Sequence, residues 1–406
     1  MNSFDKLKKE SKSILNSIPE LISKTFPIPG KFRRALLYDI GELSKLLTNS
    51  RGERSLSYLN RPNFLSAYLY YFLPWNIYRL CVLLSSIELK MSAGDLITDL
   101  GCGPLTFVSA LWIARPDLRV TPLEFNCVDR SGPALEAGKK FFAALCEFTN
   151  SQAGAWKINL IKKDIKIKKN TDTKKAALVC AVNMFNEHYD RISHNNKTAL
   201  RDLAENAALL MHTQASESAS ILTVEPGIPQ SGRFISFLRE AFIELGRMPS
   251  SPCAHTAGCP LLSGANDQRQ HRQSNTANQR TKKERWCHFA FETADAPKDL
   301  MSLSAAAKLQ KDRLVFSFLH AGAVSKAKTQ DEITANSADV RVISDAFPLP
   351  GNKYGRYGCS ERGLTLITGE KRIIEMTGSL SLCSITGLIV TEKRDEKSGA
   401  VIMELK

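Results

Sequence analysis

The stretch AGDLITDLGCGPLTFVSALWIARP, residues 93–116, decides the fold. It contains two apolar runs, and Gly101, Gly103 and Pro104 lie between them. The first run predicts a strand. Pro104 suits the first turn of a helix, because the amide hydrogen that proline lacks has no partner there. The glycines permit the sharp turn and let backbone amides approach a ligand closely. We therefore expect a strand, a turn and a helix of the kind that builds α/β sheets.

The alternation of strand and helix continues beyond this stretch. Apolar runs predict strands at 123–129, 157–165, 176–185 and 218–227, with helices at 131–148 and 197–211 between some of them. This order favours a doubly wound, largely parallel α/β sheet. We expect four segments: an N-terminal helical region at 1–90, the sheet domain at 91–250, a cysteine-rich segment at 251–338 with a flexible insertion at 263–285, and a small β module at 339–406.

The net charge of +14 over 406 residues favours a polyanionic partner. Residues 156–175 carry eight lysines, and residues 268–285 carry six basic side chains. These clusters predict binding to nucleic acid, and a merely solvated basic surface is the alternative. The N-terminus lacks the apolar core of a signal peptide. The most apolar stretch, 64–87, is broken by Pro74, Asn76 and Arg79, which indicates buried helices rather than a membrane span. We expect a cytoplasmic monomer without a membrane partner.

The glycine turn predicts a nucleoside-binding site. Asp99 lies at the end of the first strand and Asp129 at the end of the second, where a carboxylate can accept hydrogen bonds from ribose hydroxyls. A dinucleotide site would need a third glycine where Leu105 or Thr106 stands. The pattern instead resembles the first motif of S-adenosylmethionine-dependent methyltransferases, and that resemblance implies that Asp164 contacts the adenine amine. A tight turn that binds nothing is the alternative.

Three of the ten cysteines lie in polar surroundings that suit metal ligands. Cys81, Cys146 and Cys180 lie in apolar runs and are expected to pack in the core. Cys253, Cys259 and Cys287 lie among Pro, Gly, His and Thr. A fourth ligand would come from His255, His288, Cys359 or Cys383, of which Cys383 lies in a strand-like run typical of a core. Four sulfurs would suit a [4Fe–4S] cluster or zinc, and a histidine would favour zinc. Free loop thiols without metal are the alternative.

Several motifs together resemble one family. They include YLNRPNFLSAYLYYFLP (58–74), VNMFNEHYD (182–190), LTVEPGIPQSGRF (222–234), PCAHTAGCPL (252–261), WCHFAFE (286–292) and YGRYGCSERG (354–363). The sequence is similar to the mitochondrial and bacterial small-ribosomal-subunit Rsm-type methyltransferase-like family. The resemblance implies a class I (Rossmann-like) methyltransferase fold, S-adenosyl-L-methionine as cofactor, and docking on small-subunit ribosomal RNA during ribosome assembly.

The resemblance also assigns residues. It implies a [4Fe–4S] cluster on Cys253, Cys259, Cys287 and Cys359, and it makes Asn186 and Glu187 the candidates for lining the active site. Local capping of a helix is the alternative for that pair. The sequence departs from the family at Leu105, where a further glycine is usual.

Two functions follow as hypotheses. The first is an S-adenosylmethionine-dependent methyltransferase acting on small-subunit ribosomal RNA. The second is a non-catalytic iron–sulfur assembly factor that keeps the fold and a vestigial site, because no catalytic base is recognisable. A radical enzyme is disfavoured by the wide spacing from Cys287 to Cys359 and by the α/β pattern.

Overall fold

The computed structural model describes residues 7–48, 58–150, 155–168, 174–253, 255–263, 285–324, 337–378, 380–386 and 393–405. Most of the insertion expected at 263–285, and part of the lysine-rich stretch at 156–175, lie outside the described residues. Along the chain, the N-terminal helices, the large sheet with its helices and the small sheet follow one another in the order that the sequence predicts.

The helices of the N-terminal region and of the large domain precede, cover or follow the large sheet. They are α1 (Lys9–Thr25), α2 (Arg33–Thr48), α3 (Pro62–Ala67), a π-helical turn (Tyr68–Phe72), α4 (Leu73–Leu84), α5 (Thr106–Ala114), α6 (Gly132–Phe148), α7 (Asn186–Tyr189), α8 (Lys197–Gln214), α9 (Pro229–Glu244), α10 (Pro260–Ser263) and α11 (Lys298–Ala306).

The strands form two sheets. The first contains β1 (Leu96–Leu100), β2 (Leu123–Asp129), β3 (Trp156–Lys162), β4 (Ala176–Val182), β5 (Ala215–Pro226), β6 (Arg247–Ser251), β7 (Phe289–Glu292) and β8 (Arg313–Val324). The second contains β9 (Ser337–Val342), β10 (Phe347–Leu349), β11 (Lys353–Ser360), β12 (Gly363–Gly369), β13 (Leu382–Thr386) and β14 (Val401–Glu404), with helix α12 (Lys371–Met376).

The large sheet has the order β3-β2-β1-β4-β5-β8-β6. Strands β1 to β5 are parallel, and β8 runs antiparallel to β5. This confirms the doubly wound α/β prediction. The sheet also continues past the boundary expected at residue 250. Strands β7 and β8 pair within it and so belong with the large sheet rather than with a separate cysteine-rich segment.

One edge of the sheet is built from two separate strands. Strand β6 pairs with residues 320–324 of β8, and β7 pairs with residues 313–316 along the same edge. The chain leaves the sheet after β6, on one side of residues 317–319, and rejoins it at β7, on their other side. The segment that carries Cys253, Cys259 and Cys287 is therefore an excursion from a single edge.

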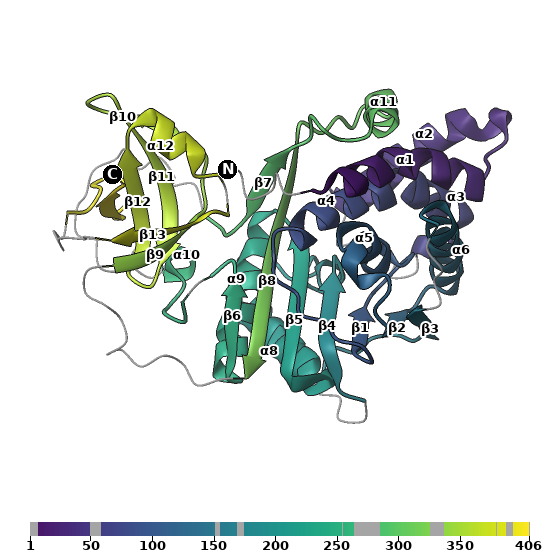
Figure 1. Cartoon of the computed structure of the whole chain (residues 1–406), viewed down its shortest axis with the longest axis horizontal. Helices are drawn as coiled ribbons and strands as arrows, with labels where there is room; N and C mark the ends of the chain where they lie inside the picture. Colours follow the sequence, from purple (N-terminus) through teal and green to yellow (C-terminus); the bar gives the residue numbers. More distant parts are fainter. Residues whose placement is uncertain are drawn as a thin grey trace.

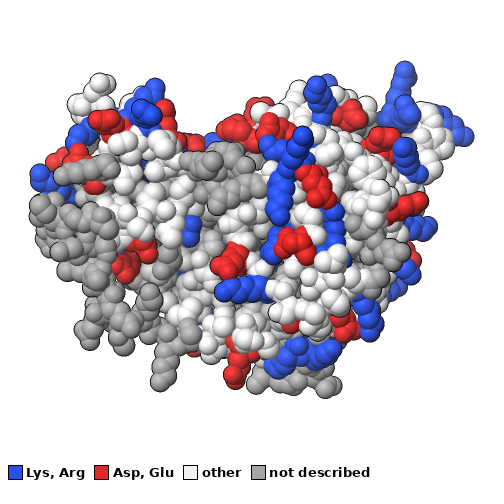
Figure 2. Space-filling model, viewed as in Figure 1, with Lys and Arg blue, Asp and Glu red and all other residues white. Residues whose placement is uncertain are grey.

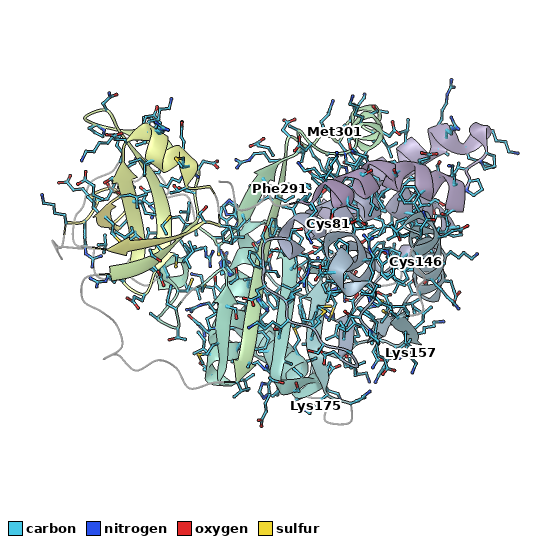
Figure 3. All side chains as sticks on the ribbon, in the orientation of Figure 1. Cys81, Cys146, Lys157, Lys175, Phe291 and Met301 are labelled. Atoms are coloured by element: carbon cyan, nitrogen blue, oxygen red, sulfur yellow. The ribbon has the colours of Figure 1, made fainter. Side chains whose placement is uncertain are left out.

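Apolar side chains cover both faces of the large sheet, as its buried parallel strands require. On one face Ile97, Phe125 and Phe318 pack under helices α1 to α6 and α11. On the other face Leu96, Val179 and Ile221 pack against α8 and α9. Cys81, Cys146 and Cys180 are buried, as predicted; Figure 3 shows Cys81 and Cys146 among the helices over the first face.

The small sheet lies beside the β8–β6 edge of the large one (Figure 1). It has the order β13-β9-β11-β12-β14, with β10 paired to β11, which agrees with the β-like sequence from residue 339. Its core contains Val340, Ile367 and Met403. Arg341 on β9 donates from Nε to the carbonyl oxygen of Pro252 at 2.6 Å and so joins the two sheets next to Cys253. No described helix is long and apolar enough to span a membrane.

Candidate functional site

A deep pocket lies at the carboxyl ends of β1, β2 and β4, where open α/β sheets bind their ligands. Six of the sequence-predicted residues at this edge line it, and they are Asp99, Gly101, Gly103, Asp129, Asn186 and Glu187. Side chains from the N-terminal helices, among them Tyr68, Asn76 and Arg79, form the opposite wall.

The glycine turn forms the floor of the pocket. Gly101 and Gly103 have φ of 70° and 52°, in the left-handed region that glycine adopts without strain. A Cβ at Gly101 would lie 2.5 Å from Cγ of Met184, so this position also needs glycine for space. A Cβ at Gly103 would meet nothing within 4 Å, which leaves room for a ligand over the turn.

Leu105 takes the place of the family's further glycine without closing the pocket. Its φ of 55° is left-handed, so the backbone has the conformation that glycine would favour. Its side chain is fully buried in the helical core and does not line the pocket. Gly138 of α6 makes room for it, since a Cβ there would lie 2.8 Å from Leu105 Cγ. The departure at Leu105 therefore changes the packing behind the turn and leaves the ligand side open.

Asp129 is held by the two backbone segments that flank the pocket. Its Oδ2 accepts a hydrogen bond from the Gly103 amide at 2.9 Å, and its Oδ1 accepts one from the Ser131 amide at 2.8 Å. Burial raises the pKa of Asp129. Each carboxylate oxygen has a second lone pair, so the group can still accept hydrogen bonds from two ligand hydroxyls.

Two buried oxygens on the pocket wall have no hydrogen-bond partner among the described residues. They are Asp99 Oδ2 and Asn183 Oδ1. Burial raises the pKa of Asp99 to about 7, and the Cys180 thiol donates to its other oxygen at 3.5 Å. Unsatisfied buried acceptors are rare and call for a donor. A ligand that carries ammonium or hydroxyl donors fits this wall.

Asp164 does not line the pocket, although the sequence placed it at the adenine. It lies 3.4 Å from Arg130 Nη2 and its side chain is 63% exposed. The same guanidinium lies 3.7 Å from Glu187 Oε2. Arg130 thus lies between Asp164 and Glu187, and the structure brings Glu187, but not Asp164, to the pocket.

Glu225 positions the Asn186–Glu187 turn, and sequence analysis does not single it out. It lies in the VEPG motif at the end of β5. Oε1 accepts from the Phe185 amide at 2.9 Å and Oε2 from the Tyr189 hydroxyl at 2.8 Å. Burial raises its pKa to about 8. A buried carboxylate that precedes a Pro-Gly turn at a strand end is the signal that could have identified it.

The four predicted cysteines lie around one small pocket. Cys253 follows β6, Cys259 precedes α10, Cys287 precedes β7 and Cys359 comes from β11 of the small sheet. All four line this second pocket. Burial raises the pKa of Cys253, Cys287 and Cys359, and the neighbouring thiols raise it further. The structure thus brings together residues that are far apart in the sequence.

The alternative fourth ligands lie elsewhere or beside the pocket. His255 Nε2 lies 3.5 Å from Cys359 Sγ. His288 stacks on Trp286, and its Nδ1 lies 3.0 Å from the Trp286 carbonyl oxygen. Cys383 lies in β13 against the small core and does not line the pocket. Cys359 is the one of these alternatives that completes the thiol set.

Arg239 of α9 also lines the four-cysteine pocket. One of its nitrogens donates to the carbonyl oxygens of His255 and Ala257 at 2.5 and 2.9 Å. Its Nε and Nη1 are buried without a hydrogen-bond partner in the described part of the chain. A buried cation without an ion-pair partner is costly, and this cost is compensated when an anionic group fills the pocket.

Among the described residues, no group of three or more His, Cys, Asp or Glu side chains converges closely enough to hold a metal ion. The four sulfurs therefore share a pocket without meeting at one point. This geometry does not match a single ion, which needs all ligands within about 2.3 Å of its centre.

Gly232 of α9 lets the Cys287 segment approach. A Cβ at this position would lie 2.7 Å from Trp286 Cδ1 and 2.8 Å from the Cys287 carbonyl oxygen. We expect Gly232→Ala to lower the free energy of unfolding by about 1–3 kcal/mol, because a backbone atom must move. Gly258→Ala, next to Cys259, is the matched control, since a Cβ there meets nothing within 4 Å. Urea unfolding of both variants tests this, and equal stabilities would contradict it.

The described basic residues do not form one patch on the face shown in Figure 2, where Lys and Arg alternate with Asp and Glu. Within the lysine-rich stretch, Lys157 and Lys174 pair with Glu124 at 2.9 and 3.3 Å, near the start of the parallel strands. Lys157 and Lys175 lie at this edge (Figure 3). Lys163 lines the pocket at the opposite edge. The described lysines of this stretch therefore lie at two opposite ends of the parallel strands.

The strand order, the single antiparallel strand β8 and the pocket over the glycine turn define a class I methyltransferase fold. The model of a family described as "Mitochondrial small ribosomal subunit Rsm22" matches residues 98–346. The chain belongs to this family. No curated protein sequence matches this chain.

Solved structures of methyltransferases are similar to the chain at low identity. Geranyl diphosphate C-methyltransferase from Streptomyces coelicolor A3(2), in complex with S-adenosyl-L-homocysteine, is 9% identical over 61% of this chain and 79% of that chain, with a TM-score of 0.31. A SAM-dependent methyltransferase from Geobacter sulfurreducens, with the same ligand, is 12% identical over 62% and 91%, with a TM-score of 0.29. A ribosomal protein L11 methylase from Lactobacillus delbrueckii subsp. bulgaricus is 13% identical over 42% and 69%, with a TM-score of 0.27.

Proposed function

We propose that this protein binds S-adenosyl-L-methionine in the pocket over the glycine turn and acts on small-subunit ribosomal RNA during ribosome assembly. The observation that carries this proposal is the pocket itself. Its floor is the Gly101–Gly103 turn, Asp129 lies at the end that suits a ribose, and unpartnered acceptors on Asp99 and Asn183 suit the donor's ammonium. The donor would supply an electrophilic methyl group, and these side chains would orient it.

The four-cysteine pocket supports a [4Fe–4S] cluster held by Cys253, Cys259, Cys287 and Cys359. The ligands are all sulfur, which suits iron–sulfur clusters and zinc. A cluster takes its thiolates at separate iron atoms, so it tolerates sulfurs that surround a pocket without converging on one point. The unpaired Nε and Nη1 of Arg239 fit the net negative charge of four thiolates around such a core. Zinc, the alternative that the sequence left open, fits less well, because a single ion needs ligands that meet at one point. The cluster would tie the small sheet to the split edge strand.

The ribosomal partner is supported by the family and by the charge of +14. Small-subunit ribosomal RNA is the polyanion that this membership suggests. A cytoplasmic location and a monomeric state, both expected from the sequence, complete the proposal.

Donor binding and methyl transfer test the first part of the proposal. Calorimetric titration with S-adenosyl-L-homocysteine should give a one-to-one complex, and radiolabelled S-adenosyl-L-methionine should label ribosomal RNA in small-subunit assembly intermediates. Absence of both binding and labelling would refute it. Iron and sulfide analysis of anaerobically purified protein, with absorption spectra, distinguishes a cluster from zinc and from empty thiols.

A non-catalytic assembly factor is the second candidate. Asn186 is only 5% exposed, and Glu187 lies within ion-pair distance of Arg130. Neither side chain is therefore placed as an evident general base, which proton removal from an RNA acceptor would need. If the protein binds the methyl donor and ribosomal RNA but transfers no methyl group, this candidate would be favoured.

A further inference from the structure

Two basic side chains line the wall of the donor pocket that the N-terminal helices form. Arg79 comes from α4, and Lys311 precedes β8. Neither takes part in any ion pair among the described residues, and Arg79 Nε is buried without a hydrogen-bond partner. Lys311 Nζ lies 5.7 Å from the centre of the Tyr71 ring. Two cations thus face one pocket, and no described carboxylate lies within ion-pair distance of either of them.

Their electrostatics agree with this geometry. Burial lowers the pKa of Arg79 to about 10, and burial together with the Arg79 charge lowers the pKa of Lys311 to about 8. Both groups still carry most of their positive charge at pH 7. Arg79 and Lys311 are surrounded by protein atoms but remain partly exposed to solvent, because both side chains line the pocket. An uncompensated pair of this kind destabilises the empty protein, and an oxyanion that binds between the cations would repay that cost.

The position of the pair indicates which anion it would bind. Asp129 ends β2, whereas Lys311 lies just before β8, four strands further along the order β2-β1-β4-β5-β8. At about 4.8 Å between neighbouring strands, this separation is roughly 19 Å. A nucleoside donor that is held at Asp129 and over the Gly101–Gly103 turn occupies the β2 and β1 part of the pocket. Lys311 enters the pocket from the β8 side, where a methyl acceptor would approach, and Arg79 on the helix wall lies near enough for its charge to lower the pKa of that lysine.

We propose that Arg79 and Lys311 form an oxyanion subsite that binds a phosphate group of the methyl acceptor. This inference rests on the proposed function for its assignment to the acceptor. A phosphate of an RNA strand is the group that the proposed partner supplies. The arginine can offer two parallel N–H donors to phosphate oxygens, and the lysine adds a point charge. Asn76, which donates to the Tyr68 hydroxyl at 3.3 Å, lies on the same wall and keeps that hydroxyl on the helix side.

Inorganic phosphate is the probe, and Arg79→Met and Lys311→Met are the variants. Without phosphate, we expect both variants to melt at or above the temperature of the wild type, because each removes an uncompensated buried charge. Phosphate should raise the melting temperature of the wild type more than chloride does at equal ionic strength. The variants should bind phosphate at least tenfold more weakly. Lys298→Met, an exposed lysine on α11, is the control of equal charge change.

Titration with S-adenosyl-L-homocysteine separates the two possible anions. Its affinity should stay within about twofold in both variants, while the affinity for a ribosomal RNA fragment falls with that for phosphate. Lys311→Arg should retain the phosphate response. A tenfold loss of S-adenosyl-L-homocysteine affinity with an unchanged phosphate response would assign the pair to the donor's carboxylate and overturn the inference. Equal phosphate responses in wild type and variants, or variants that melt well below the wild type without phosphate, would also overturn it.

The phosphate response does not depend on methyl transfer. If the wild type binds phosphate through this pair but binds neither donor nor ribosomal RNA, the proposed function is refuted. The oxyanion subsite is then confirmed as an anion site, but it is not assigned to a methyl acceptor. If donor and RNA bind normally and phosphate has no specific effect, the subsite alone fails.

Discussion

Cys287→Ser is expected to yield protein with little iron and a melting temperature lower by on the order of 10 °C, since metal binding contributes directly to folding free energy. Cys287 lies two residues before the start of β7, and its carbonyl oxygen accepts from Ser317 Oγ of β8 at 2.7 Å. A serine there keeps the size of the side chain but offers iron a much poorer ligand. We expect affinity for ribosomal RNA to fall as well, because the small sheet would be fixed to the large one less firmly, through contacts such as Arg341 to Pro252 alone.

Cys383→Ser is the matched control, because Cys383 lies in the small sheet outside the four-cysteine pocket. Iron and sulfide analysis and thermal melting should show a loss for Cys287→Ser and almost none for Cys383→Ser. Cys359→Ser should resemble Cys287→Ser, because it removes the single ligand that the small sheet contributes. Normal iron content and melting in the Cys287 variant would refute the cluster assignment.

Asp129→Ala is expected to weaken S-adenosyl-L-homocysteine binding by about a hundredfold or more. The loss of two charge-assisted hydrogen bonds to ribose hydroxyls, each contributing about 1.5–3 kcal/mol, accounts for this change. Asp129 also accepts from the amides of Gly103 and Ser131, so the variant should be less stable by about 1–3 kcal/mol. Calorimetry below the melting transition separates the two effects.

Asp164→Ala serves as the comparison for Asp129→Ala. Its side chain is largely exposed and does not line the pocket. We expect a change in donor affinity of no more than about threefold, which corresponds to the small contribution of a surface ion pair. Donor binding that is lost in Asp164→Ala and retained in Asp129→Ala would show that the pocket has been assigned to the wrong carboxylate.

Local sequence patterns were sufficient to predict the parallel half of the large sheet. Strands such as β1 and β4 are buried on both faces and therefore read as continuous apolar runs, and the glycine turn identifies the edge where a ligand binds. The edge built by β6, β7 and β8 could not be predicted in this way. Its pairing depends on contacts between residues on either side of a long excursion, and no local pattern records such contacts.

The same reasoning explains the outcome at the sites. Asp129, Cys253, Cys259 and Cys287 were predicted because their residue types and spacing follow chemical rules that are visible in one chain, whereas Cys359 was chosen as the fourth ligand only through the resemblance to a family. Lys311 and Glu225 were missed because Lys311 reaches the pocket, and Glu225 reaches the turn behind it, only through tertiary folding. Arg79 is visible in the sequence as a charged residue inside the most apolar stretch. The sequence analysis used it only as evidence against a membrane span. Asp164 was placed at the pocket by analogy with other methyltransferases, and its side chain lies outside it.

The divided edge of the large sheet has a consequence for the tendency of the protein to aggregate in the cell. Residues 317–319 of β8 pair with β5 on one side, while β6 and β7 meet the other side only above and below them. Unprotected strand edges are templates for pairing with another chain. If the proposed cluster holds the segments around Cys253 and Cys287 in place, molecules that failed to acquire iron would leave this edge less covered and would be the ones most prone to aggregate. Maturation of the cluster would then determine solubility as well as shape.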